Sequence, residues 1–163
     1  MYITDTVYGI LLCNHLDIKH IWVRILSVYG PYDSTKTMVM STIIKLLKGE
    51  VPKFTKGEQM WDYLYNEDAA NAMHLLGDKG CDGKVYCLGS GETRPLHEFI
   101  HEIRDLVNKN AEIELGVLPY NENQVMFLCS DISDLIRDTG FTPETTFARG
   151  IEKTIRWVQK EIE

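Results

Sequence analysis

Residues 59–76 change their hydrophobic period halfway along, and this change constrains the fold more than any other feature of the sequence. Trp61, Tyr63 and Tyr65 alternate with other residues, which predicts a short strand with three aromatic side chains on one face. From Asp68 onward the apolar residues recur at helical spacing, and the Asp68 side chain is expected to cap the helix. A strand that passes directly into a helix ends at the edge of a sheet, where ligands tend to bind in open α/β folds. An ordinary strand–helix unit without a ligand has the same pattern.

The rest of the sequence alternates between segments typical of strands and segments typical of helices. Predicted helices cover residues 2–16, 37–48, 95–107, 131–140 and 146–162, and predicted strands cover residues 20–26, 51–54, 84–88, 113–118 and 125–129. The run at 20–26 is almost continuously apolar, which is typical of a strand covered on both faces. This alternation predicts an α/β fold with a largely parallel sheet, in a single domain that covers residues 1–163.

Composition and charge exclude several classes of function. The 163 residues carry a net charge of −7 and no basic cluster, whereas a nucleic-acid binder normally presents a basic face. No apolar run approaches the length that spans a bilayer, and the first residues lack the layout of a signal peptide. We therefore expect a cytoplasmic protein that contacts neither nucleic acid nor membrane. Cys13, Cys81, Cys87 and Cys129 form no Cys-x-x-Cys pair and are expected to be reduced thiols.

Two short motifs suggest chemistry, and each has a simpler explanation. The turn Gly89-Ser90-Gly91 follows a strand and precedes a helix, but it lacks the third glycine of a dinucleotide-binding fingerprint. The run His97-Glu98-Phe99-Ile100-His101 matches the His-Glu-x-x-His pattern of zinc hydrolases, in which two imidazoles share one helix face. Phe99 and Ile100 belong to the apolar stripe of this helix, so we expect both histidines to face solvent. A zinc hydrolase stays a distant alternative, and no metal site is predicted.

Four segments, taken together and in this order, resemble one protein family. They are residues 23–31 (VRILSVYGP), 56–70 (KGEQMWDYLYNEDAA), 83–91 (GKVYCLGSG) and 130–133 (SDIS). Their sequence and spacing are similar to those of the extended short-chain dehydrogenases, the NAD-dependent nucleotide-sugar epimerases and dehydratases. The resemblance implies partial Rossmann-like parallel sheet elements plus the small substrate-binding α/β lobe. It covers only the C-terminal half of such enzymes, so the N-terminal dinucleotide-binding half is expected to be absent.

The resemblance also implies a catalytic residue. Tyr2 falls where the family keeps its catalytic tyrosine, counted back from the helix around Leu12 and Cys13. The family's lysine, four residues later, is Thr6 in this chain. A lysine cation lowers the pKa of such a tyrosine, and threonine carries no charge. Proton transfer by the tyrosine, which the family uses in catalysis, is therefore expected to be strongly impaired.

Five residues occupy the positions at which the resemblance implies substrate binding. Ser27 replaces an asparagine on the diphosphate side, Phe54 is expected to pack on the nucleotide base, and Trp61 replaces an arginine that binds the phosphates. Asn121 and Gln124 replace a second arginine and an aspartate, which grip phosphate and ribose. An arginine–phosphate contact contributes about 1.5–3 kcal/mol. Losing two of them is expected to weaken diphosphate binding by about two orders of magnitude.

The sequence therefore predicts a protein of the epimerase/dehydratase type that binds or acts on a nucleotide sugar. NAD is implied by the resemblance, but this chain alone is not expected to bind it or to transfer a hydride. The expected partners are further copies of the chain, or a separate chain that supplies the Rossmann half. The alternative is a non-catalytic module that binds a nucleotide sugar or another protein, because apolar surface left uncovered favours association.

Overall fold

The computed structural model describes the backbone of residues 2–162 and the side chains of residues 7–161. Its elements, in chain order, are α1 (Tyr2–His15), β1 (Trp22–Ile25), β2 (Val28–Tyr29), α2 (Met38–Leu47), β3 (Met60–Trp61), β4 (Leu64–Tyr65), α3 (Asn66–Lys79), β5 (Val85–Leu88), β6 (Arg94–Pro95), α4 (Leu96–Asn108), α5 (Ser133–Thr139) and α6 (Phe147–Ile162). The predicted α/β class is confirmed, and each predicted helix is present with ends shifted by a few residues.

The sheet consists of three short strand pairs. β1 and β5 are parallel, with Trp22 opposite Val85 and Ile25 opposite Leu88. β2 and β4 are also parallel, whereas β3 and β6 are antiparallel. The connections between the parallel partners include helices, as parallel pairing requires. The predicted parallel sheet is therefore present in pieces.

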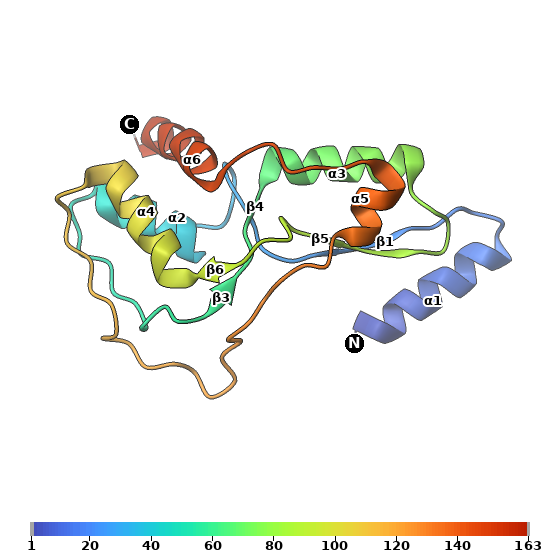
Figure 1. Cartoon of the computed structure of the whole chain (residues 1–163), viewed down its shortest axis with the longest axis horizontal. Helices are drawn as coiled ribbons and strands as arrows, with labels where there is room; N and C mark the ends of the chain where they lie inside the picture. The colour runs from blue at the N-terminus through green and yellow to red at the C-terminus, as the bar shows by residue number, and fades with distance from the viewer. Residues whose placement is uncertain (1, 163) are drawn as a thin grey trace.

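Two hydrophobic cores meet at β4. One core lies between α2, α4 and α6, and the other lies between β5, α3 and α5; Figure 1 shows these groups at opposite ends of the central strands. Successive strand residues point to opposite faces, so Leu64 enters the second core while Tyr65 enters the first. The short strand β4 thus ties the two halves of the molecule together.

The predicted strand with three aromatic residues on one face is wrong. β3 and β4 are separate strands with different partners, and Asp62 lies between them with only 1% of its surface exposed. Tyr63 and Tyr65 pack in the first core against Tyr29, at ring-centroid distances of 5.9 and 5.6 Å. The Trp61 side chain instead contacts a loop that follows β1.

Other expectations about strands also need correction. Residues 51–54, 113–118 and 125–129 form only single bridges, Lys53 with Glu114 and Met60 with Phe127. They run along the surface and leave apolar side chains in solvent, as Phe127 does with 66% exposure. β1 is not covered on both faces, because Ile25 is 56% exposed and β5 is its only strand partner among the described residues.

The helix ends show which local predictions were right. Gly140 ends α5 in the left-handed conformation (φ 75°), at the predicted end of this helix. Thr37, which the sequence did not single out, caps α2 by accepting a hydrogen bond from the Met40 N–H group. Asp68 does not cap α3. Its carboxylate oxygen Oδ2 accepts a hydrogen bond from Thr145 N at 2.9 Å and so fixes the segment that leads into α6.

Candidate functional site

Asp62 holds together the loops that follow β3 and β5 and the loop that precedes α5. Its Oδ1 accepts hydrogen bonds from Ser90 N (2.8 Å) and Ser90 Oγ (2.6 Å), and its Oδ2 accepts from Gly91 N (3.2 Å) and Ser130 N (3.0 Å). Gly89 is needed beside this carboxylate, because a Cβ there would lie 2.6 Å from Asp62 Oδ2 and 1.9 Å from Ser130 Oγ. We call this arrangement the Asp62 clamp. It fixes the loops at the carboxyl end of β5, where ligands bind in open α/β sheets.

Ser27 and Trp61, both predicted to bind substrate, are in direct contact. Trp61 Nε1 donates a hydrogen bond to Ser27 Oγ at 2.8 Å. The position of Ser27 is itself fixed, because its carbonyl oxygen accepts from Leu64 N at 2.9 Å. The indole ring is therefore held in one orientation between the end of β1 and β3. A partly exposed, oriented indole can stack on a base or a sugar ring.

The structure does not join the other predicted substrate residues to this pair by any hydrogen bond within the described part of the chain. Phe54 is partly buried, and its backbone bonds to Glu114 and Leu118. Asn121 and Gln124 share one turn, in which Gln124 N donates to Asn121 O and the Gln124 side chain donates to the Val125 carbonyl. Their roles stay predictions.

Met126 and Phe127, two apolar residues that the sequence did not single out, lie beside β3. Met60 N donates to Met126 O at 2.9 Å and Leu128 N donates to Met60 O at 2.9 Å, so Phe127 lies beside Met60. Both Met126 and Phe127 are exposed. The predicted strand at 125–129 was the signal that this segment pairs with another, but it did not identify β3 as the partner.

Tyr2 begins α1, and Thr6 lies one helical turn further along. The side chains of both residues lie outside the described part of the structure, so the catalytic assignment of Tyr2 stays a prediction.

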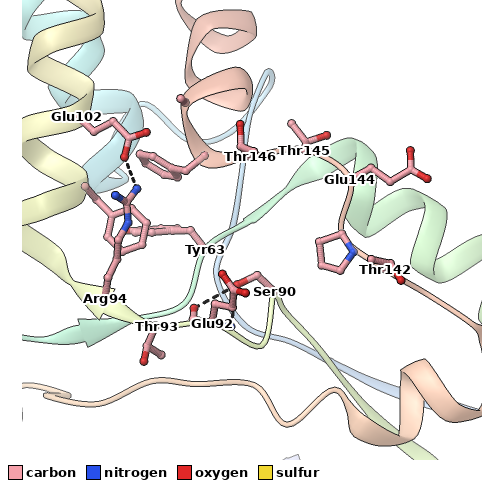
Figure 2. A pocket seen from close by; sticks show the side chains of 14 residues that line it. Tyr63, Ser90, Glu92, Thr93, Arg94, Glu102, Thr142, Glu144, Thr145 and Thr146 are labelled. Carbon is pink, nitrogen blue, oxygen red and sulfur yellow. Dashed lines mark hydrogen bonds and ion pairs between the residues drawn. The ribbon is translucent and has the colours of Figure 1, made fainter.

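A cleft of about 660 Å³ opens beside the Asp62 clamp. Figure 2 shows Arg94 and Glu102 on one side of it, residues 142–146 on the other, and Ser90 between them. The Arg94 guanidinium forms an ion pair with Glu102 and lies 4.0 Å from the centre of the Phe99 ring. Burial raises the pKa of the Tyr63 phenol, and this lining side chain stays neutral well above physiological pH.

The Gly89-Ser90-Gly91 turn is built differently from a glycine-rich phosphate-binding turn. In the Gly89-Ser90-Gly91 turn, the N–H groups of Ser90 and Gly91 already donate to Asp62. A dinucleotide site of the glycine-rich type needs such N–H groups free to face the pyrophosphate. The N–H groups of Ser90 and Gly91 in this turn are therefore engaged in holding the fold.

His97 and His101 lie on α4 with ring centroids 6.4 Å apart. Both are partly buried rather than facing solvent freely, and His97 Nδ1 lies 3.0 Å from the carbonyl oxygen of Gly57. That carbonyl can only accept, so Nδ1 carries the proton in this contact. Among residues 7–161, no three His, Cys, Asp or Glu side chains are grouped closely enough to share a metal ion.

Comparison with solved structures defines the fold class first. A structure of UDP-glucose 4-epimerase from Thermotoga maritima with UDP-glucose matches with a TM-score of 0.90 at 21% identity, over 99% of this chain and 52% of that chain. A dTDP-glucose 4,6-dehydratase from Bacillus anthracis in complex with NAD matches with a TM-score of 0.81 at 21% identity, over 94% of this chain and 49% of that chain. The chain thus has the fold of about half of a Rossmann-fold epimerase or dehydratase.

Sequence comparison then gives the family. The sequence model of the NAD dependent epimerase/dehydratase family matches residues 6–89, and the chain belongs to this family. The dTDP-glucose 4,6-dehydratase of Salmonella typhimurium is 30% identical over an alignment 140 residues long, and the match covers 79% of this chain and 38% of that protein. The chain therefore spans well under half the length of this relative. None of the helices in the described residues has the length and apolar character needed to cross a membrane.

Proposed function

We propose that this chain is the substrate-binding part of an epimerase/dehydratase-type protein and that it binds a nucleotide sugar beside Trp61 and Ser27. The observation that carries the proposal is the hydrogen bond between these two side chains, because it joins two positions at which the resemblance implies substrate binding, one in the loop after β1 and one on β3. The family match and the fold support the same class of ligand. Phe54, Asn121 and Gln124 are proposed to complete the contacts to base, phosphate and ribose.

The diphosphate is expected to be held weakly at this site. Trp61 supplies an aromatic face where the family has a cation. Arg94 lies directly opposite Trp61 in the β3–β6 pair, but its guanidinium is paired with Glu102 and stacked on Phe99. A cation engaged in this way offers less to a phosphate than a free one. Base and sugar stacking on the indole is therefore proposed to supply most of the affinity.

A thermal-shift panel tests the proposal with UDP-, dTDP-, CDP- and GDP-sugars and with NAD⁺, each added alone. A ligand at 100 times its dissociation constant stabilises the fold by about 2.7 kcal/mol, which raises Tm by about 5–10 °C for a chain of this size. We expect a shift with one nucleotide class and none with NAD⁺. Trp61→Ala removes the indole and its hydrogen bond to Ser27, and it should weaken binding of that class about tenfold or more. Absence of any shift with the original chain, or equal binding by the variant, would refute the proposal.

Hydride transfer by this chain alone is not expected. In the Gly89–Gly91 turn the N–H groups of Ser90 and Gly91 already donate to Asp62, and the residue at the lysine position of the family is Thr6. The chain is incubated with NAD⁺ and the nucleotide sugar that shifts Tm, and NADH absorbance and sugar products are followed. Turnover would contradict this part of the proposal while leaving the binding site intact.

A protein-interaction role is the second candidate, and exposed apolar surface on α1 favours it. Tyr8 and Leu11 are 70% and 62% exposed, and Ile25 at the end of β1 is 56% exposed. We propose that this surface is covered by a further copy of the chain or by a chain that supplies a Rossmann half. Light scattering over a concentration series tests self-association, and a constant monomer mass would leave only the second partner. A cytoplasmic location is part of the proposal and is supported by four free cysteines.

A further inference from the structure

We propose that the cleft between Arg94, Ser90 and residues 142–146 is a binding site for an uncharged saccharide ring, separate from the surface at Trp61 and Ser27. Neither Trp61 nor Ser27 lines it. Its volume of about 660 Å³ suits a small organic ligand or one unit of a longer chain. The chemistry of its walls determines which class of ligand can bind.

The cleft is fixed at two places before any ligand arrives. Between its two sides, the Asp62 clamp holds Ser90 through two hydrogen bonds. On the side formed by residues 142–146, Asp68 accepts a hydrogen bond from Thr145 N at 2.9 Å, which positions the segment that precedes α6. A wall that is already ordered loses little conformational entropy on binding, so even a small ligand can bind measurably.

Hydrogen-bonding groups in the cleft are available. Arg94 donates through Nη2 to Glu102, and its Nε and Nη1 have no acceptor within residues 7–161. The hydroxyl groups of Thr93, Thr142 and Thr145 line the cleft and have no hydrogen-bond partner among the same residues. Hydroxyls both donate and accept, arginine only donates and ionised carboxylates only accept. A ligand with many hydroxyl groups can satisfy all three kinds of group.

An anion is a poor ligand for this cleft. The carboxylates of Glu92, Glu102 and Glu144 line it together with a single cation, Arg94. A phosphate would therefore approach more negative than positive charge, and the one guanidinium is already paired with Glu102. Repulsion by like charges opposes binding of an anion.

A cation and a purely apolar molecule are also poor ligands. The aromatic wall already carries a cation, because the Arg94 guanidinium lies 4.0 Å from the Phe99 ring centre and 5.1 Å from that of Phe147. A second cation against the same rings would meet that charge. An apolar molecule would remove water from the Arg94–Glu102 pair and from the threonine hydroxyls without replacing its hydrogen bonds, which is costly.

A saccharide ring avoids these penalties. Its hydroxyls can donate to the Glu102 carboxylate and accept from Arg94 Nε and Nη1. Its C–H face can pack against the side chains of Tyr63 and Phe147, which line the same cleft. Figure 2 shows Tyr63 and Thr93 beside Arg94, with Thr142 and Thr145 on the facing segment, so polar and aromatic contacts are available to one ring.

Titration of the isotope-labelled chain with uncharged methyl glycosides, followed by amide chemical shifts in NMR, tests the proposal. Inorganic phosphate and methylammonium are titrated in parallel. We expect at least one glycoside to shift the amides of residues 90–94 and 142–148, with no comparable shift from either ion. Larger shifts at these amides with phosphate or methylammonium, glycoside shifts confined to other parts of the chain, or no glycoside shifts at all would overturn the proposal.

Variants separate the cleft from the rest of the molecule. Glu102→Gln keeps the shape of the side chain and removes its charge, and it should weaken glycoside binding about tenfold, as loss of a hydrogen bond to a charged group does. Glu67→Gln makes the same change at a carboxylate that does not line this cleft, and this variant should bind the glycoside unchanged. Should Glu102→Gln fail to fold, Thr145→Val removes one hydroxyl with little change of shape and should weaken binding several-fold. Unchanged affinity in the folded cleft variant would refute the assignment.

Discussion

Replacing Asp62 by asparagine should destabilise the fold far more than its small change in shape suggests. The aspartate carboxylate accepts hydrogen bonds from Ser90 N and Oγ on one oxygen and from Gly91 N and Ser130 N on the other. Asparagine offers only one oxygen. Whichever way its amide lies, an NH₂ group faces backbone N–H donors that had an acceptor before.

The magnitude follows from the bonds that are lost. A hydrogen bond to a charged group contributes about 1.5–3 kcal/mol, and a buried donor left without a partner adds its own penalty. The orientation that places NH₂ against Gly91 and Ser130 loses two such bonds, so we expect the free energy of unfolding to fall by about 3–5 kcal/mol after partial relaxation. For a chain of this length that corresponds to a Tm about 10 °C lower.

Thermal unfolding of Asp62→Asn and of a matched control, Asp131→Asn, measures this. Asp131 is exposed and accepts one backbone hydrogen bond, from Ser133 N at 3.0 Å, so its substitution should lower Tm by only about 3 °C. Amide exchange at Gly91 and Ser130 should also become faster in Asp62→Asn than in the control. Equal Tm values for the two variants would refute the view that the buried carboxylate holds these loops in place.

Further substitutions test the charge network of α5 and the packing of α6. Lys84 donates to Asp138 at 2.6 Å and holds the pKa of that carboxyl group below its usual range. The folded-state pKa is thus lower than the unfolded one, so the contribution to stability is complete above about pH 4 and is lost as the pH falls through the folded-state value. Asp138→Asn should accordingly lower Tm at neutral pH, and a pH series should show the difference from the original chain narrowing in acid. Gly150→Ala would place a Cβ 2.2 Å from the Tyr29 hydroxyl oxygen and should cost about 1–3 kcal/mol, although alanine is the better helix former. Gly77→Ala, whose Cβ meets nothing within 4 Å, should stabilise the chain by about 0.5–1 kcal/mol. Urea unfolding of both variants checks the opposite signs, and a stabilised Gly150→Ala would contradict the packing described.

The helices could be predicted because their determinants are local. The apolar spacing of α4 brings Phe99, Ile100 and Ile103 to one face, and these are its buried residues. Gly140 ends α5 as expected, because it can adopt a positive φ without steric cost. The strands predicted at 113–118 and 125–129, by contrast, are wrong, since these residues form only single bridges. Their apolar residues suit a strand, but whether a ladder forms depends on a partner that the local sequence does not specify.

The two strands around Asp62 show what the sequence concealed. Alternating aromatics indicated one strand, and the carboxylate within it was the sign that the pattern is interrupted. A buried aspartate needs donors, and its donors come from residues 28 to 68 positions further along the chain. The contact between Trp61 and Ser27 was likewise not predicted, although each residue was singled out separately. Both features, the interruption of the strand at Asp62 and the contact between Trp61 and Ser27, depend on residues that are far apart in the sequence.

Residues 59–76 nevertheless organise the whole molecule. They do so through two carboxylates and one short strand, and not through a single aromatic strand as their pattern predicted. Asp62 fixes the loops after β5 and before α5, and Asp68 fixes the segment before α6. Between these carboxylates, Leu64 and Tyr65 anchor one strand in both cores. Trp61 faces the proposed nucleotide surface, and the proposed saccharide cleft lies between the two loops that the carboxylates hold. One continuous stretch thus positions both surfaces. Loss of either carboxylate should therefore weaken ligand binding at a distance from the substituted residue, because the loop that the carboxylate holds becomes less well ordered.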